Sequence, residues 1–250
     1  MKMGFSHLTL LLARLFFVPK CVACGERLPL AHPNGVLCDI CREKYDNEKE
    51  ASCPACAARL SDCLCVPPDL PRSRVRRMVK LTRYRPSSED ISAKIVYALK
   101  HRRLIELQRF VALEFLPILH PLVKNAEEWA VSFPPRSAAS LRRDGFDHAA
   151  LVARCLAKAL GISYAPCFIH RKQTVAQKKL SRTARLAAAR EGYALQKGID
   201  VSGKRVILFD DICTSGATLT TCARLLYKAG AKEVVLAAFA ITPQKYAARF

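Results

Sequence analysis

Two adjacent carboxylates, Asp210 and Asp211, stand between an apolar run at 206–209 and a segment rich in hydroxyl groups. The apolar run predicts a buried strand, and the segment after it predicts the start of a helix. Unpaired N–H groups at a helix N-terminus bind phosphate, and paired carboxylates accept hydrogen bonds from vicinal hydroxyls or act through a magnesium-bound water. The pattern therefore indicates a ribose 5-phosphate site, with a generic well-capped strand–turn–helix as the alternative. The residues expected to bind the phosphate are Cys213, Thr214, Ser215, Gly216, Ala217 and Thr218.

Eight of the twelve cysteines form two groups of four with spacings typical of metal ligands. A CxxC turn directs two thiolates at one ion, and two such turns complete a tetrahedral site. For the first group the alternative is a redox or disulfide role, and for the second it is a partial site. Four thiolates leave no open position for water, which indicates a structural or docking module and not metal catalysis. We predict structural zinc at Cys21, Cys24, Cys38 and Cys41, and a second zinc at Cys53, Cys56, Cys63 and Cys65.

Residues 4–18 are apolar but are interrupted by Arg14. The stretch is shorter than the roughly 20 residues that cross a bilayer, and no small-residue cleavage site follows it. We expect a short amphipathic helix packed on the protein, with a place in a membrane interface as the alternative. No other run reaches membrane-spanning length, so we expect a cytoplasmic protein with at most peripheral membrane association. Thiols stay reduced in that compartment, which favours metal binding over disulfides.

The composition is that of a globular protein, with 51% hydrophobic and 25% charged residues in 250, which excludes a mainly disordered chain or a fibre. The formal net charge of +20 favours an anionic partner, with a solvated basic surface as the alternative. The cysteine groups lie near the N-terminus, whereas most of the surplus positive charge follows residue 80. We therefore predict two domains: 1–70, with the apolar helix and the cysteine module, and 71–250.

The larger predicted domain alternates strands and helices. Strands are expected at 75–84, 129–133, 206–209 and 234–241, and helices from an N-cap at Ser88, at 102–116, at 147–160 and at 216–229. Wholly apolar strands that alternate with helices are typical of a parallel sheet covered on both faces. The predicted fold class is therefore α/β, with a mostly parallel sheet flanked by helices and preceded by a small cysteine-rich zinc-ribbon module.

The segment 206–218 resembles the binding motif for ribose phosphate diphosphate (PRPP) in the type I phosphoribosyltransferases. Together with the cysteine module, nearly the whole chain resembles the ComF family, which combines a zinc-ribbon segment with a phosphoribosyltransferase-like domain. Further matches are the apolar segment leading into CxxCG, the strand VVLAAFAIT, and an R…Q-x-x-L…R pattern at Arg171, Gln177, Leu180 and Arg185. The resemblance implies binding of PRPP with Mg²⁺ and a link to DNA uptake in competent bacteria.

The resemblance also implies roles for particular residues. Asp210 and Asp211 would hold the ribose hydroxyls during phosphoribosyl transfer. Cationic side chains would stabilise the leaving diphosphate, and Arg143 is the catalytic candidate among them. Each of these cations could equally be a solvated surface charge. The cationic candidates are Arg136, Arg142, Arg143, Arg171 and Lys172, with Arg136 and Arg171 expected to bind PRPP.

One segment departs from the family pattern. Where the family usually has R-G-F-N-Q, this chain has Asp144-Gly145-Phe146-Asp147-His148. An acid thus replaces the arginine at a position where a family member would contact diphosphate or an acceptor. His148 and His170 could carry protons, although a lone histidine is more often structural or solvent-facing.

Three hypotheses follow. The first is a ComF-like accessory protein of DNA uptake that binds ribose phosphates or single-stranded DNA and docks a helicase-like partner. The second is a phosphoribosyltransferase of nucleotide salvage that transfers phosphoribose from PRPP to a nitrogenous base. The third is a zinc-dependent interaction module with a regulatory phosphate site. The basic body of the chain favours the first, because a groove that follows phosphates needs such charge.

Overall fold

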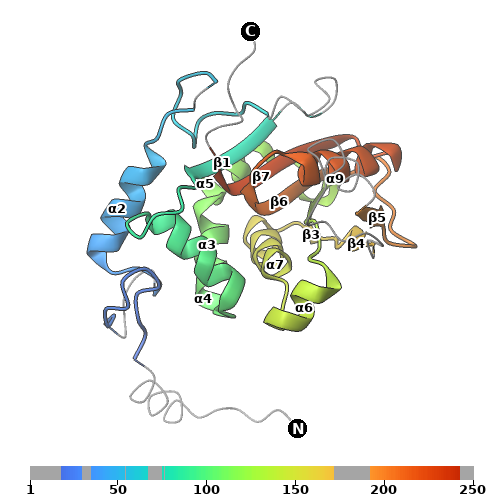
Figure 1. Ribbon diagram of the computed structural model, residues 1–250. Helices are drawn as coiled ribbons and strands as arrows, with labels where there is room; N and C mark the ends of the chain where they lie inside the picture. Colours follow the sequence, from blue (N-terminus) through green and yellow to red (C-terminus); the bar gives the residue numbers. More distant parts are fainter. Residues whose placement is uncertain are drawn as a thin grey trace.

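A computed structural model describes residues 18–29, 35–53, 55–66, 75, 77–171 and 192–242 (Figure 1). The apolar stretch expected to form the first helix and most of the basic middle segment lie outside these residues. Within the described part, five parallel strands form one sheet in the order β1-β7-β6-β2-β3. Their bounds are β1 (Arg77–Arg83), β7 (Glu233–Ile241), β6 (Arg205–Cys213), β2 (Trp129–Ser132) and β3 (Ser163–Tyr164). This confirms the predicted α/β class with its parallel sheet.

Helices connect the parallel strands. The α-helices are α2 (Asp39–Lys49), α3 (Ile91–His101), α4 (Ile105–Glu114), α5 (Leu116–Leu119), α6 (Ala138–Asp144), α7 (His148–Leu160) and α9 (Ala217–Lys228). Two short 3-10 helices are η1 (His120–Leu122) and η2 (Ala126–Glu128), and a separate antiparallel pair consists of β4 (Phe168–His170) and β5 (Tyr193–Leu195).

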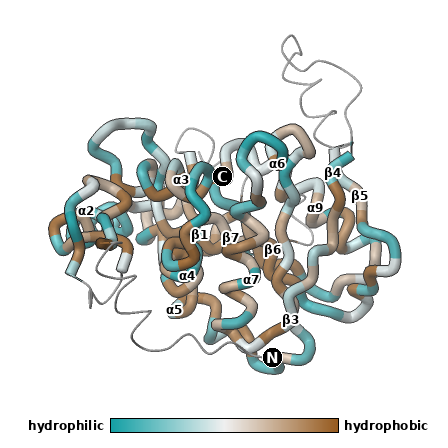
Figure 2. The backbone as a smooth tube through the Cα atoms, turned by 90° about the horizontal axis from the view of Figure 1, so that it is seen from below, coloured by the Kyte–Doolittle hydropathy of each residue, from teal (hydrophilic) through white to brown (hydrophobic). Residues whose placement is uncertain are grey.

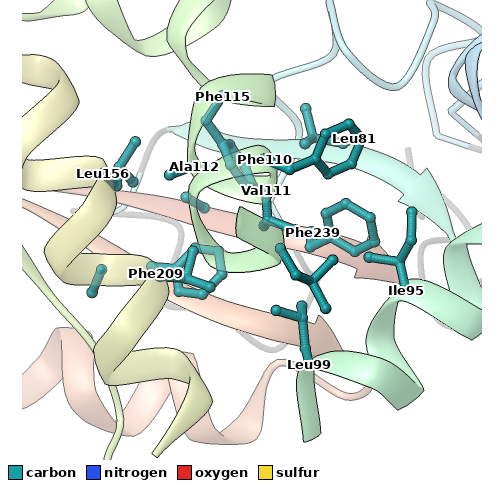
Figure 3. Packing of buried hydrophobic residues seen from close by; sticks show 14 of the residues in the cluster. Leu81, Ile95, Leu99, Phe110, Val111, Ala112, Phe115, Leu156, Phe209 and Phe239 are labelled. Carbon is teal, nitrogen blue, oxygen red and sulfur yellow. The ribbon is translucent and has the colours of Figure 1, made fainter. Parts of the chain in front are cut away.

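Two hydrophobic clusters cover the two faces of the sheet. One face packs against α3, α4 and α7, where Leu99 and Leu156 meet the strand residues Phe209 and Phe239 (Figure 3). The other face packs mainly against α9, through residues such as Leu219 and Leu226. Figure 2 shows the hydrophobic residues concentrated along the central strands, as expected for strands buried on both sides.

The N-terminal cysteine module joins the same core. Tyr45 of α2 is fully buried, stacks on Phe239 of β7 at 6.1 Å between ring centroids, and meets Phe110 of α4 at 5.7 Å. Cys21 and Cys41 belong to the same buried cluster as these rings. The proposed division at residue 70 therefore separates segments of sequence that share one hydrophobic core.

Two helix boundaries differ from the prediction. The helix after β1 has Asp90 as its N-cap, not Ser88, because the Asp90 carboxylate accepts the Ala93 N–H at 2.6 Å. The helix predicted at 102–116 begins only at Ile105, since the preceding helix still occupies residues up to His101. This helix ends at Glu114, and Pro117 lies in the first turn of the short helix α5, where a proline is tolerated.

Candidate functional site

Asp210 and Asp211 lie inside β6, which corrects the expectation of a strand confined to 206–209. The strand continues to Cys213 because β7 runs beside it and pairs as far as Ile241. Successive residues of a strand point to opposite faces. Asp211 accordingly faces the side covered by α3 and α7, whereas Asp210 lies on the α9 side. The two carboxylates thus approach a ligand at the strand end from different faces of the sheet.

Asp211 is buried and contacts two polar side chains from two different helices. Its Oδ2 lies 3.0 Å from Nε2 of His148 at the start of α7 and 3.1 Å from Nζ of Lys100 in the last turn of α3. Burial alone would raise the pKa of Asp211, but the close contact with His148 and the charge of Lys100 outweigh burial and hold the pKa below its usual range. Asp211 is therefore an ionised carboxylate with a fixed orientation.

Asp210 has the opposite electrostatic character. It is partly exposed, and its Oδ1 accepts the backbone N–H of Asp211 at 2.9 Å. Loss of hydration, followed by the negative charge of Asp211, raises the pKa of Asp210 well above its usual value. A cation that binds Asp210 would relieve this repulsion, so the donor chemistry of Asp210 fits a hard cation such as Mg²⁺.

The loop between β6 and α9 has the geometry of an anion site. Gly216 adopts the left-handed conformation at φ 73°, and α9 begins at the next residue, Ala217. The N-cap residue is Gly216, which has no side chain to accept a hydrogen bond, so the N–H groups of the first turn of α9 are not capped by it. Thr242, just after β7, fixes the start of the loop by donating its N–H to the Cys213 carbonyl at 3.2 Å. The hydroxyl-bearing residues of the loop are all at least partly exposed: Thr214, Ser215 and Thr218.

The loop after β2 lies at the same edge of the sheet, because β2 runs parallel to β6 beside it. Arg136 and Arg143 both pair with Asp144, the acid that departs from the family pattern. Arg143 and then Arg136 lower the pKa of Asp144 to about 2, and Nη2 of Arg143 lies 3.1 Å from Asp144 Oδ2. Arg136 is mostly buried whereas Arg143 has 66% of its side chain exposed. Of these two arginines, the exposed Arg143 is therefore the one that can reach a ligand.

The remaining predicted cations stand farther along the chain. Arg171 follows β4, is exposed, and donates its backbone N–H to the Gly192 carbonyl at 2.9 Å. The partner strand β5 packs against α9, which brings this hairpin to the phosphate-loop side of the sheet. The role of Arg171 stays a prediction, since no described contact joins its side chain to the loop. Lys172 lies outside the described residues.

Both groups of four cysteines come together in space. In each group all four Sγ atoms lie within 4.8 Å of one another. Tetrahedral zinc with Zn–S bonds of about 2.3 Å requires sulfur–sulfur separations of roughly 3.8 Å. The Cys24–Cys38 and Cys56–Cys63 pairs, at 3.7 and 3.4 Å, are close to that value. Both clusters are therefore compatible with zinc.

Hydrogen bonding prepares the first cluster for a metal. Burial raises the pKa of Cys21, but backbone N–H groups led by that of Cys38 outweigh burial and lower the pKa to about 7. Gly25, just after Cys24, has a left-handed φ of 80°, which suits the tight turn of a zinc knuckle. The hydrogen bonds therefore favour the thiolate form of Cys21, whereas burial raises the pKa of Cys41 in the same cluster.

Sequence reasoning did not identify Lys100 and treated His148 as a lone histidine. Lys100 lies 111 positions before Asp211, and nothing in its local pattern marks it. The sequence feature that could have pointed to His148 is its position at the end of the segment 144–148, which departs from the family pattern. Only the packing of α3 and α7 on one face of the sheet brings both side chains to Asp211.

Comparisons with known proteins match the part of the chain that contains Asp210, Asp211 and the loop before α9. A family model described as phosphoribosyl transferase domain matches residues 140–249, which include α6, α7, β6, α9 and β7. Residues 140–249 of this chain thus match a phosphoribosyl transferase domain, and two cysteine clusters lie N-terminal to them.

Among its relatives, the DNA utilization protein YhgH of Salmonella typhimurium is 26% identical over 216 residues, covering 83% of this chain and 91% of the relative. The competence protein ComFC of Bacillus subtilis is 27% identical over 204 residues, covering 80% and 82%. The chain is homologous to these YhgH and ComFC proteins.

Solved structures with a similar arrangement include a hypoxanthine phosphoribosyltransferase from Staphylococcus aureus. It is 13% identical, with a TM-score of 0.38, over 57% of this chain and 67% of that one. Among the helices that the structure describes, none is long and apolar enough to cross a membrane.

Proposed function

We propose that this protein binds PRPP, or a related ribose phosphate, where β6 meets α9. The observation that supports the proposal is the pairing of an open helix N-terminus after Gly216 with the carboxylates of Asp210 and Asp211. The 5-phosphate would accept hydrogen bonds from the N–H groups and hydroxyls of the loop. The ribose hydroxyls would donate to the two carboxylates.

The arginines of the loop after β2 would bind the diphosphate. Arg143 is exposed beside Asp144 and would contact the diphosphate directly, whereas the mostly buried Arg136 would hold the loop in place. Arg171 would approach from the β4–β5 hairpin. Bound Mg²⁺ would neutralise part of the diphosphate charge, and Asp210 is the residue suited to hold it.

In a transfer reaction the bond between ribose C1 and diphosphate breaks as the acceptor forms its bond to C1. Asp211, fixed by His148 and Lys100, would hold the ribose so that C1 stays in line with the acceptor. Arg143 would stabilise the negative charge that develops on the diphosphate. The second candidate function, phosphoribosyl transfer to a base in nucleotide salvage, is supported by the family match over residues 140–249.

The biological role we propose is in the use of external DNA by a cytoplasmic protein. The names of the YhgH and ComFC relatives support it, and the net charge of +20 suits a phosphate-rich partner. The finer proposals are direct binding of single-stranded DNA and docking to a helicase-like protein of DNA uptake.

The first test is calorimetric titration of the zinc-loaded protein with PRPP and Mg²⁺. We expect micromolar binding that is lost in a double variant, Asp210→Ala with Asp211→Ala. Asp200→Asn, which changes an exposed acid outside the site, serves as the control and should bind PRPP normally. Absence of binding to the unmodified protein would contradict the proposal.

A second set of assays separates the two candidate functions. Diphosphate release with a common nucleobase would support nucleotide salvage. Retardation of single-stranded DNA at physiological salt, without diphosphate release, would support the DNA role.

A further inference from the structure

Lys80 lies in the middle of the edge strand β1, and its side chain is completely buried. Its ammonium donates to the carbonyl oxygens of Cys63 at 3.0 Å, Cys65 at 2.9 Å and Met78 at 3.3 Å. Two of these three carbonyls belong to predicted ligands of the second cysteine cluster. The lysine therefore contacts the backbone of the cluster directly.

The charge of Lys80 has no carboxylate partner. None of the ion pairs formed by the described residues includes it, although most other buried or half-buried cations of the chain have one. Three carbonyls satisfy the three N–H donors of an ammonium but supply no net negative charge. A buried charge without a counter-charge is strongly unfavourable, so a negative group beside Lys80 is needed.

A metal tetrathiolate would be that negative group. Four thiolates and one divalent zinc ion carry a net charge of −2, and the four sulfur atoms of this cluster already lie within 4.8 Å of one another. We propose that Lys80 is the buried counter-charge of a zinc tetrathiolate at Cys53, Cys56, Cys63 and Cys65. On this proposal the second cluster is a filled site and not a partial one.

The same contacts fasten the cysteine loop 51–66 to the sheet. Next to Lys80, the Met78 N–H donates to the Leu64 carbonyl at 3.0 Å, and Arg83 donates to the Ser52 carbonyl. β1 pairs with β7 on one side only, and an uncovered strand edge is prone to pair with other chains. The zinc–Lys80 charge pair would hold this loop in place over the edge strand, beside the sheet that carries the ribose-phosphate site.

The test measures zinc affinity by competition with a chromogenic chelator, in the full-length protein. Wild type should hold two zinc ions per chain, one in each cluster. Lys80→Met keeps the aliphatic volume of the side chain but removes its charge. It should lower the zinc affinity of one of the two clusters by about 10- to 100-fold, the usual effect of losing an outer-shell partner. Lys44→Met, which removes an exposed lysine from α2, is the matched control and should leave both ions unchanged.

The affected ion is assigned with a second variant. Cys53→Ser removes a ligand of the second cluster, and adding Lys80→Met to it should produce no further loss of zinc. Unchanged zinc affinity in Lys80→Met would overturn the proposal, and so would a single zinc ion in the wild type. A further loss of zinc affinity when Lys80→Met is added to Cys53→Ser would also overturn the proposal, because Lys80 would then act on the first cluster.

Hydrogen exchange covers the case in which Lys80→Met does not fold. In Cys53→Ser the backbone amide of Met78 should exchange at least about tenfold faster than in wild type, because the loop that covers β1 is released. Cys155→Ser, at a cysteine of α7 outside both clusters, should leave that amide protected. Equal protection of Met78 in both variants would show that the metal does not hold the loop.

Discussion

At the scale of single residues, the proposed ribose-phosphate site depends on how Asp211 is held. Its carboxylate is buried between His148 and Lys100, and these two partners keep its pKa low despite the burial. Asp144 and His148 both depart from the family pattern, yet each has a compensating contact in this chain: Asp144 with two arginines, His148 with Asp211. The two residues that differ from the family pattern therefore each have a contact that holds this part of the candidate site in place.

Replacement of His148 by alanine tests this role. We expect PRPP affinity to fall roughly ten- to hundredfold, the equivalent of about 1.5–3 kcal/mol for a hydrogen bond to a charged group. His148→Gln keeps an N–H donor and should recover most of the affinity. His120→Ala, at an exposed histidine away from the site, is the control. Calorimetry measures all three, and equal losses for the glutamine and alanine variants would argue against a role of the polar contact between His148 and Asp211.

At the scale of elements, we expect the turn from β6 into α9 to decide whether phosphate can bind. Its backbone reverses through Gly216 in the left-handed conformation, so the first N–H groups of α9 face the loop. A side chain at this position would strain the turn, and a shifted turn would redirect the N–H groups.

Gly216→Ala should therefore change both stability and binding. We expect a loss of about 1–2 kcal/mol in the free energy of unfolding, the usual penalty for a left-handed L residue, together with loss of PRPP binding. Gly161→Ala provides a matched control, because Gly161 is also left-handed, at φ 67°, but ends α7. The control should lose similar stability in urea denaturation and still bind PRPP; binding by both variants would refute the phosphate role of the turn.

At the scale of the whole molecule, the cysteine module and the sheet form one packed body. Tyr45 of the module is buried against Phe110 and Phe239, and Lys80 of the sheet is buried against the second cysteine loop. Such shared packing predicts that the module and the sheet unfold together and not as separate domains.

Denaturation followed by the fluorescence of Trp129, the single tryptophan and a residue of β2, reports on the sheet. Tyr45→Ala should lower the free energy of unfolding by about 3–5 kcal/mol, as for other large aromatic side chains removed from a core. Tyr45→Phe keeps the ring and should stay within about 1 kcal/mol of wild type, because the buried hydroxyl has no hydrogen-bond partner among the described residues. If the tryptophan transition did not shift in Tyr45→Ala, the module and the sheet would be independent.

Local patterns in the sequence determined much of this protein. Runs of apolar residues bounded by turn residues predicted the strands of a parallel sheet, and the CxxC and CxC spacings predicted the two cysteine clusters. The acidic and hydroxyl-rich segment around Asp210 located the candidate site. These features depend on neighbouring residues, so a single sequence displays them.

Only the tertiary structure decided which distant side chains meet. The extension of β6 to Cys213 depends on β7 as a pairing partner, and this extension places Asp210 and Asp211 on opposite faces of the sheet. The contacts of Lys100 with Asp211, and of Lys80 with the second cysteine cluster, join residues from different elements. Hydrogen bonds and charge pairs of this kind act over a few ångströms in space, whereas a sequence pattern records only separation along the chain.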